Sequence, residues 1–449
     1  MQTALGIIVT ILVLTFLVVI HEAAHAFVAR LCGMRVTELF VGLPYGPSVS
    51  VRSPRSGIRY GATLALLGGY TRISGMAYRP DRRLPLALAL VNARGRLSVE
   101  ELAEVLRVDP DEAGMLLDAL ADIGSVEPVD GRHGSGDATV FQTVRRDASG
   151  RTVHDRGHDF LAPGATEAGA PLATSVAPEE LLARDVARTY AGKGFLRRAA
   201  VLVAGIAANI LCAIVIVCAF LMLHGVQVVQ PQLAAVQEGS PAAQAGMAAG
   251  DVITAINGTD VSDGYQAVTT ALAQVPAGDE VTVAFAHEGQ TREATVRLGD
   301  DGMLGVSYGS ETRRLPLGQA VAAAGSYAVA TAQAIVSLLM PSQTMEVLDQ
   351  SAGIVGIVAI TGQAAERGAW DVLLLAASLS LSLGWLNLLP IPPLDGGKLL
   401  IEAIQAVIRR PVPMAVQSAI SAAGMALILL LFVVMVVLDL TRLATGVYA

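Results

Sequence analysis

Long apolar runs restrict this chain more than any other feature of its sequence. Three of them, residues 4–28, 199–223 and 419–438, are long enough to cross a bilayer, because roughly 20 helical residues span its hydrocarbon core. A fourth, residues 372–389, is shorter and ends against a proline cluster. With 53% hydrophobic and 16% charged residues, the chain is predicted to be a polytopic α-helical membrane protein with about four transmembrane helices.

The distribution of lysine and arginine predicts the orientation of these spans. Arg30 and Arg35 follow the first span, basic residues at 193–198 precede the second, and residues 225–291 contain neither lysine nor arginine. The positive-inside rule therefore places residues 30–197 in the cytoplasm and the N-terminus outside. The first run lacks a positive start and a cleavage site, so we expect it to be retained. An integral plasma (inner) membrane protein is the expected class.

The first apolar run ends in "HEAAH", which places three ionisable groups in a span. His21 and His25 are four residues apart, so on a helix they share one face and can bind one metal ion. Glu22 between them can act as a general base on a metal-bound water. The alternative is a pair of structural histidines, but ionisable groups inside a span are functional candidates by default because their burial is costly.

A catalytic zinc site has three protein ligands, so a third is expected from another span. The candidate is Asp395 in "NLLPIPPLDGGKLL", where prolines stop a helix and glycines allow close backbone approach. The alternative is a turn carboxylate that caps the next segment. For Asp395 to reach the depth of His21, the segment 311–368 cannot be a single crossing, and we expect it to be interfacial or re-entrant.

Taken together, these motifs resemble the site-2 proteases, a family of intramembrane zinc metalloproteases. The resemblance rests on "HEAAH", "NLLPIPPLDGG", "GGYTRISG" at 68–75 and "AGIAAN" at 204–209. It implies that His21, His25 and Asp395 bind Zn²⁺ and that Glu22 is the general base. It also implies that Asn387 lies near the cleft and contacts substrate.

Residues 36–76 alternate apolar and polar side chains between turn signals, which predicts strands. In the site-2 proteases a re-entrant β-structure lies here and is thought to receive substrate by strand addition. That resemblance makes Gly68, Gly69 and Tyr70 candidate substrate-binding residues. A small cytoplasmic hairpin without a substrate role is the alternative.

Two further modules are expected outside the membrane. Residues 238–261 combine a short helix, a Gly250-Asp251 turn and a strand, and they resemble a PDZ domain, an α+β module placed outside. It could bind extended peptide at a sheet edge or serve only as a spacer. In the cytoplasm, a capping box at Ser98 and a second helix that starts at Pro110 predict a winged-helix-like module.

The winged-helix-like insertion is strongly acidic. Between residues 98 and 123 only Arg107 is basic, whereas the acidic residues are Glu100, Glu101, Glu104, Asp109, Asp111, Glu112, Asp118 and Asp122. This balance repels phosphate and argues against nucleic acid as a partner. We expect a cytoplasmic protein partner or a regulatory role. Beyond it, residues 161–178 are predicted to be a flexible linker and "HDRGHD" at 154–159 a solvated loop.

The expected domains are a first transmembrane helix with the re-entrant β-region (1–77), the winged-helix-like insertion (78–145), a linker with an amphipathic helix (146–195), the second transmembrane helix (196–225), the PDZ-like domain (226–310), the interfacial or re-entrant segment (311–368), and the third (369–400) and fourth (401–449) transmembrane helices.

The sequence leaves two functions open. The first is an intramembrane zinc metalloprotease that cleaves transmembrane-helix substrates in regulated intramembrane proteolysis, with its active site toward the cytoplasm. The second is a membrane-anchored PDZ adaptor with a structural or inactive metal site. An intact Glu22 favours the protease, because a structural site needs no general base.

Overall fold

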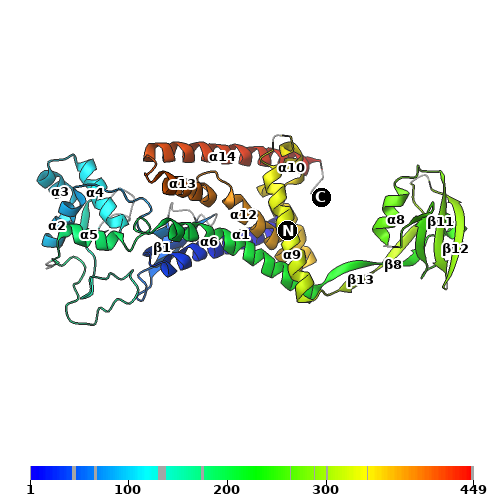
Figure 1. The fold of residues 1–449 in the computed structure, drawn as a ribbon, viewed down its shortest axis with the longest axis horizontal. Helices are drawn as coiled ribbons and strands as arrows, with labels where there is room; N and C mark the ends of the chain where they lie inside the picture. Colours follow the sequence, from blue (N-terminus) through cyan, green and yellow to red (C-terminus); the bar gives the residue numbers. More distant parts are fainter. Residues whose placement is uncertain are drawn as a thin grey trace. The chain divides into compact units, whose positions relative to one another are not determined.

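A computed structural model describes residues 2–42, 47–64, 68–129, 138–172, 176–262, 264–287, 289–299, 302–340 and 342–445 (Figure 1). The chain divides into two compact units. The first comprises residues 1–216 and 325–449, and the second comprises residues 217–324. The first unit holds most of the apolar helical residues together with the β-region and the insertion.

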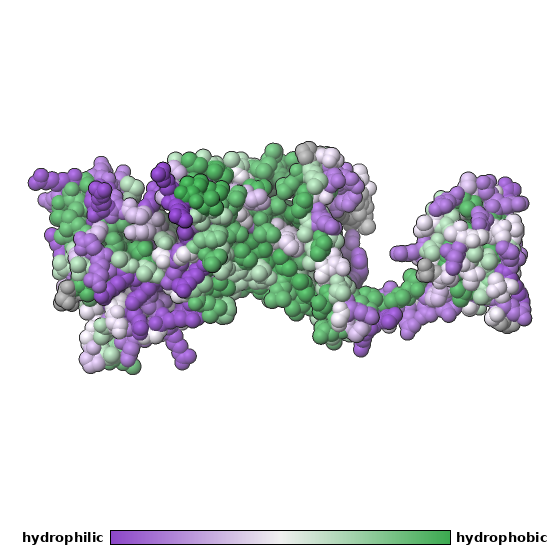
Figure 2. Space-filling model, in the orientation of Figure 1, coloured by the Kyte–Doolittle hydropathy of each residue, from purple (hydrophilic) through white to green (hydrophobic). Residues whose placement is uncertain are grey.

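Four long helices lie where the sequence predicts spans. They are α1 (Gln2–Leu31), α6 (Phe195–Ala219, continued by a π-helical turn at Phe220–His224), α12 (Ala369–Leu388) and α14 (Met414–Ala444). Apolar side chains cover much of the face of the first unit shown in Figure 2. Large side chains such as Leu12 and Phe16 on α1 are more than half exposed. A surface of this kind is stable in lipid and costly in water.

The described part of the chain has more long apolar helical stretches than the four runs in which transmembrane helices were predicted. In the described part of the chain, six helical stretches are long and apolar enough to cross a membrane. The additional two are α9 (Leu317–Ser337) and the stretch formed by α10 (Thr344–Gln350) and α11 (Ile354–Arg367). Their mean hydropathy is only 1.3 and 1.2, against 2.9 for α1. Glycine, serine, threonine and glutamine dilute both stretches, so inspection of apolar runs did not separate them from interfacial helices.

The strands predicted between residues 36 and 76 form one four-stranded sheet. It contains β1 (Val36–Val41), β2 (Ser48–Arg52), β3 (Arg59–Thr63) and β4 (Gly69–Ile73) in the order β2-β3-β1-β4. β1 pairs with β3 in parallel and with β4 in antiparallel orientation. β4 is therefore an edge strand, and it packs against α1 near Glu22.

The insertion folds around its own apolar core. Its elements are α2 (Leu84–Arg94), β5 (Arg96–Ser98), α3 (Val99–Leu106), α4 (Pro110–Asp122), β6 (Val126–Pro128) and β7 (Val140–Thr143), with strand order β5-β7-β6. The helix α5 (Pro178–Val186), in the segment where an amphipathic helix was predicted after the insertion, packs on the same core. The predicted capping box is present at Ser98 and Glu101, and Asp109 caps α4. Buried leucines of α2, α3, α4 and α5 fill the core.

The prediction of a solvated loop at residues 154–159 was wrong at its centre. Asp155 is buried, and both of its carboxylate oxygens bond to Arg35. Sequence reasoning considered only local glycine content and missed this distant partner. In the predicted flexible linker, Thr166 pairs with Arg146 and Leu172 N donates to Asn92 O, so these residues are anchored to the insertion. Residues 173–175 of that linker lie outside the described residues.

The second unit is a small α+β domain. Its sheet has the order β12-β11-β9-β8-β13 and comprises β8 (Val226–Val236), β9 (Val252–Ile256), β11 (Glu280–His287), β12 (Gln290–Arg297) and β13 (Val306–Arg313), with β10 (Thr259–Asp260) paired to β9. Helices α7 (Pro241–Gln244) and α8 (Tyr265–Leu272) complete the domain. A groove of about 810 Å³ lies between α8 and residues 302–308, which lead into the edge strand β13.

Candidate metal centre

Helix α1 brings two imidazoles together, as the four-residue spacing predicts. His21 Nε2 and His25 Nε2 lie 3.1 Å apart, and both side chains are buried. Their juxtaposition is typical of ligands that share one cation.

The third candidate ligand arrives from the opposite end of the sequence. Asp395 is the first residue of α13 (Asp395–Ile408), and its Oδ2 lies 3.1 Å from His21 Nε2 and 3.0 Å from His25 Nε2. Its other oxygen, Oδ1, accepts a bond of 3.2 Å from Lys398 Nζ. The three candidate ligands are thus gathered around one point.

The turn that presents Asp395 is close-packed on glycines. A Cβ added to Gly396 or Gly397 would collide with the backbone of residues 388–392. A Cβ added to Gly424 on α14 would likewise collide with the carbonyl oxygen of Pro392. Only hydrogen fits at these positions, which explains why a "PPLDGG" sequence can place a carboxylate on irregular backbone beside α1.

Helix α6 orients both histidines. His25 Nδ1 donates a hydrogen bond of 2.7 Å to the carbonyl oxygen of Val201, which leaves the Nε2 lone pair free for a metal. Asn209, fully buried, places its side-chain nitrogen 3.3 Å from His21 Nδ1, while its Oδ1 has no partner in the described part of the chain. Rotating the amide by 180° lets Oδ1 accept from Nδ1–H and frees His21 Nε2 as well.

A glycine on α6 makes this close approach feasible. A Cβ built on Gly205 would lie 2.6 Å from His21 Cε1 and would also clash with His25 Nε2. The helix can therefore pack directly on the two imidazole rings only because residue 205 has no side chain.

Glu22 lines a cavity beside the histidines. The cavity has a volume of about 200 Å³, and its walls include Glu22, His25, Tyr70, Asp395 and Lys398. The edge strand β4 forms one wall: Thr71 Oγ1 donates to the carbonyl oxygen of Glu22 at 2.8 Å. The Glu22 carboxylate, two of the candidate metal ligands and the edge strand β4 therefore border the same cavity.

The residues present fit a zinc ion. Two histidines and one aspartate are the donor set of a catalytic site that keeps a position open. Tetrahedral ligand atoms about 2.0–2.1 Å from zinc lie roughly 3.4 Å from one another, and the observed separations of 3.0–3.1 Å need to widen by only a few tenths of an ångström. The unpartnered Asn209 Oδ1 fits as well, because a metal-bound His21 must donate from Nδ1.

Not every predicted residue lies in this space. Gly69 and Tyr70 line the cavity, whereas Gly68 and Asn387 are not among the described residues that do so. Gly68 O instead accepts a bond from Gly42 N in the turn before β4, and Asn387 lies in the last turn of α12. Sequence reasoning gave no role to Gly205, Asn209 or Lys398. Among the motifs that the sequence offered, only "AGIAAN" at 204–209 contains Gly205 and Asn209.

Comparisons with known proteins identify zinc metalloproteases as relatives of this chain. The family described as "Peptidase family M50" matches residues 9–431. A protein named zinc metalloprotease RasP from Shouchella clausii (strain KSM-K16) is 28% identical over 99% of this chain and 100% of its own length. A putative zinc metalloprotease, LL2128, from Lactococcus lactis subsp. lactis (strain IL1403) is 27% identical over 97% of this chain and 98% of its own. A zinc metalloprotease RasP from Oceanobacillus iheyensis is 26% identical over 97% and 99%.

Proposed function

The chain belongs to peptidase family M50, the site-2 proteases, and is an intramembrane zinc metalloprotease, and from this premise we propose the roles of its residues. His21, His25 and Asp395 hold the zinc ion, and Glu22 is the general base. The observation that carries the assignment is the convergence of these three ligands on one point beside a cavity that Glu22 lines. The adaptor alternative receives no support from the comparisons.

The chemistry is peptide-bond hydrolysis. A zinc ion held by His21, His25 and Asp395 would supply a bound water with a pKa of about 7 and would polarise the scissile carbonyl. Glu22 takes a proton from the attacking water and delivers it to the leaving nitrogen. Val201 O and Asn209 keep the imidazoles in the tautomer that leaves Nε2 unprotonated, and Lys398 holds one oxygen of Asp395 away from the histidines.

The substrate must present an unwound peptide bond, because a helix hides its amides in internal hydrogen bonds. We propose that the free edge of β4 receives the unwound segment as an added strand. Three observations support this: β4 is at the sheet edge, Gly69 and Tyr70 line the cavity, and Thr71 contacts the backbone of Glu22. Transmembrane segments of other proteins are then the substrates.

The accessory modules have proposed roles of their own. The second unit is a PDZ-like domain outside the membrane, and the groove between α8 and the edge strand β13 suits an extended peptide. The helix and strand order of residues 84–143 supports a winged-helix module on the cytoplasmic side. Its acidic surface favours a protein partner over nucleic acid.

The deciding experiment is cleavage of a reconstituted transmembrane-helix substrate by the full chain, with zinc content measured in parallel. We expect Glu22→Gln to keep zinc but to lose about 10²–10⁴-fold in rate, the usual contribution of a general base. Asp395→Asn is expected to lose zinc affinity. The control is Glu104→Gln, since Glu104 is exposed on α3 and does not line the cavity. Undiminished cleavage by Glu22→Gln would rule out the assigned base.

A further inference from the structure

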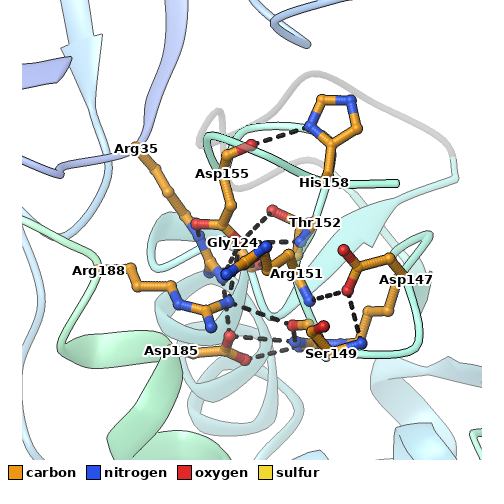
Figure 3. Close-up of polar contacts among 12 residues, drawn as sticks. Arg35, Gly124, Asp147, Ser149, Arg151, Thr152, Asp155, His158, Asp185 and Arg188 are labelled. Atoms are coloured by element: carbon orange, nitrogen blue, oxygen red, sulfur yellow. Dashed lines mark hydrogen bonds and ion pairs between the residues drawn. The ribbon is translucent and has the colours of Figure 1, made fainter. Parts of the chain in front are cut away.

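A group of buried charges lies between the β-region and the insertion (Figure 3). Arg35, between α1 and β1, is only 1% exposed. Its Nε and Nη2 donate to the two carboxylate oxygens of Asp155 at 2.9 and 2.8 Å, and Nη2 also donates to Asp185 at 2.9 Å. Its Nη1 bonds to the carbonyl oxygen of Ile123 at the end of α4. One side chain thus contacts three segments of the cytoplasmic region.

Two more arginines complete the group. Arg146 bonds to both oxygens of Asp185, at 3.1 and 2.6 Å, and Arg188 bonds to Asp155 at 3.1 Å. We call Arg35, Arg146, Asp155, Asp185 and Arg188 the Arg35 cluster. Burial by itself opposes charge on Arg35, Asp155 and Asp185, but the opposite charges beside them outweigh it: the pKa of Arg35 is raised, and the pKa values of both aspartates lie below their usual range.

Stability alone does not explain such a cluster. Replacing a buried ion network by apolar residues of similar volume is often neutral or stabilising. What apolar contacts do not provide is a fixed position, because bidentate arginine–carboxylate bonds hold their partners in one orientation. The role of the Arg35 cluster therefore depends on which segments it holds in position.

Backbone bonds around Arg35 continue to the strand beside the catalytic cavity. Ser74, directly after β4, donates from its amide to Arg35 O at 3.0 Å, and Tyr190 N donates to Ser74 O at 2.8 Å. Arg35 N in turn donates to Arg188 O at 2.9 Å. The adjacent Gly75 donates to Asp122 O at the end of α4. The end of β4 is therefore fastened to Arg35, to the insertion and to the segment after α5.

We propose that the Arg35 cluster positions the edge strand β4 for substrate, so that the cytoplasmic insertion is a support of the catalytic cavity. This inference rests on the proposed function of β4 as the substrate-receiving edge. With the cluster intact, the far end of β4 is fixed, and Gly69 and Thr71 stay beside Glu22. With the cluster broken, β4 keeps its pairing to β1, but the main chains of Arg35 and Arg188, on which the fastening of Ser74 depends, are no longer fixed by their side chains.

The test uses the full chain in lipid with Arg35→Met, which removes every bond of the guanidinium. Asp155→Asn is a milder second variant, because it leaves Arg35 with Asp185 and serves if Arg35→Met does not fold. Arg35→Lys keeps the charge without the two-pronged geometry. Arg83→Met is the matched control: Arg83 also bonds two carboxylates, Asp81 and Glu112, but on the surface of the insertion.

Three quantities are measured for each variant: zinc content, the KM and kcat for a transmembrane-helix substrate, and photo-crosslinking to that substrate from p-benzoylphenylalanine at position 70. We expect Arg35→Met to keep its zinc, to raise KM by about tenfold with kcat within about twofold, and to crosslink less. Arg35→Lys should be intermediate, and Arg83→Met should match the parent.

Unchanged KM and crosslinking in folded Arg35→Met or Asp155→Asn would overturn the inference. A joint loss of zinc, kcat and thermal stability would also overturn it, because the cluster would then only hold the fold together. If the parent chain gave no crosslinks from position 70, the proposed docking edge would fail, and this inference with it, while the roles of Glu22 and the zinc ligands would still stand on their own test.

Discussion

Asn209 shows how one buried amide controls the metal centre. Its Oδ1 lacks a partner until the amide accepts from His21 Nδ1–H. We expect Asn209→Leu to weaken zinc binding by about 10- to 100-fold, the usual cost of losing a partner of a ligating histidine. Competition with a chelating dye measures this affinity.

The matched variant for Asn209 is Asn209→Asp, which keeps an acceptor oxygen and loses the amide donor. It should bind zinc at least as tightly as the parent, because a carboxylate is a common partner of ligating histidines. Equal weakening in both variants would mean that the amide donates to His21 instead, and the proposed tautomer would be wrong.

Residues whose role is local could be predicted from the sequence. "HEAAH" encodes its geometry within one helical turn, and Asp395 is marked by prolines and glycines that force a break. Asn209 acts on a ligand that is 188 residues away. Its partner is brought close only by folding, so spacing alone could not reveal it. The same holds for Asp155, whose partner Arg35 is 120 residues distant. Lys398 lies three residues after Asp395 on α13, a local spacing that could have indicated their contact.

Among the elements, α6 packs on α1 through a single small residue. A methyl group at Gly205 would meet the rings of both His21 and His25. We therefore expect Gly205→Ala to push α6 away or to rotate the imidazoles, and to lower zinc content and cleavage together while the helices remain formed. Zinc analysis of the purified chain, with circular dichroism for helix content, checks this.

Gly325→Ala is the control for that substitution, since a Cβ at Gly325 on α9 meets no atom within 4 Å in the described structure. It should bind zinc and cleave as the parent does. If Gly205→Ala also behaved like the parent, α6 and α1 would have room to separate without disturbing His21 and His25. The close packing of Gly205 on the imidazoles would then not contribute to metal binding.

Strongly apolar elements were predictable, and diluted ones were not. The bounds of α1, α6, α12 and α14 enclose or closely match the four predicted runs, because continuous leucine, isoleucine and valine leave one interpretation. α9 and α11 mix alanine with glycine, threonine and glutamine, a composition shared by spans and interfacial helices. The sheet order of residues 36–73, with a parallel β1–β3 pair, depends on long-range pairing that alternation does not encode.

At the scale of the molecule, the path of the segment 311–368 decides on which side each module lies. α11 has 14 residues, or roughly 21 Å, and it reaches the length of a span only together with α10. It packs on Gly6 at the start of α1, and the amides of Gly353 and Gly356 donate to Asp439 near the end of α14. From residue 325 onward α9 is drawn crosswise to α6 and α14 in Figure 1. The start of α1, the start of α11 and the end of α14 therefore lie together, and both an interfacial path and two crossings are to be tested.

Cysteine labelling distinguishes the two paths in a background with Cys32, Cys212 and Cys218 replaced by alanine. Ser342 lies exposed between α9 and α10. If residues 311–368 stay at the outer interface, Ser342→Cys reacts with an impermeant maleimide from the same side as Glu238→Cys in the second unit. Glu104→Cys in the insertion should react only from the opposite side.

The opposite result for Ser342→Cys would have a definite meaning. Labelling from the side of Glu104 would show that α9 and the α10–α11 stretch each cross the membrane, which gives six spans. Because two crossings restore the original side, α12 would still begin outside and deliver Asp395 to the depth of His21. The metal centre is therefore compatible with four or six spans, whereas a single extra crossing would separate Asp395 from the histidines that lie 3.0–3.1 Å from it.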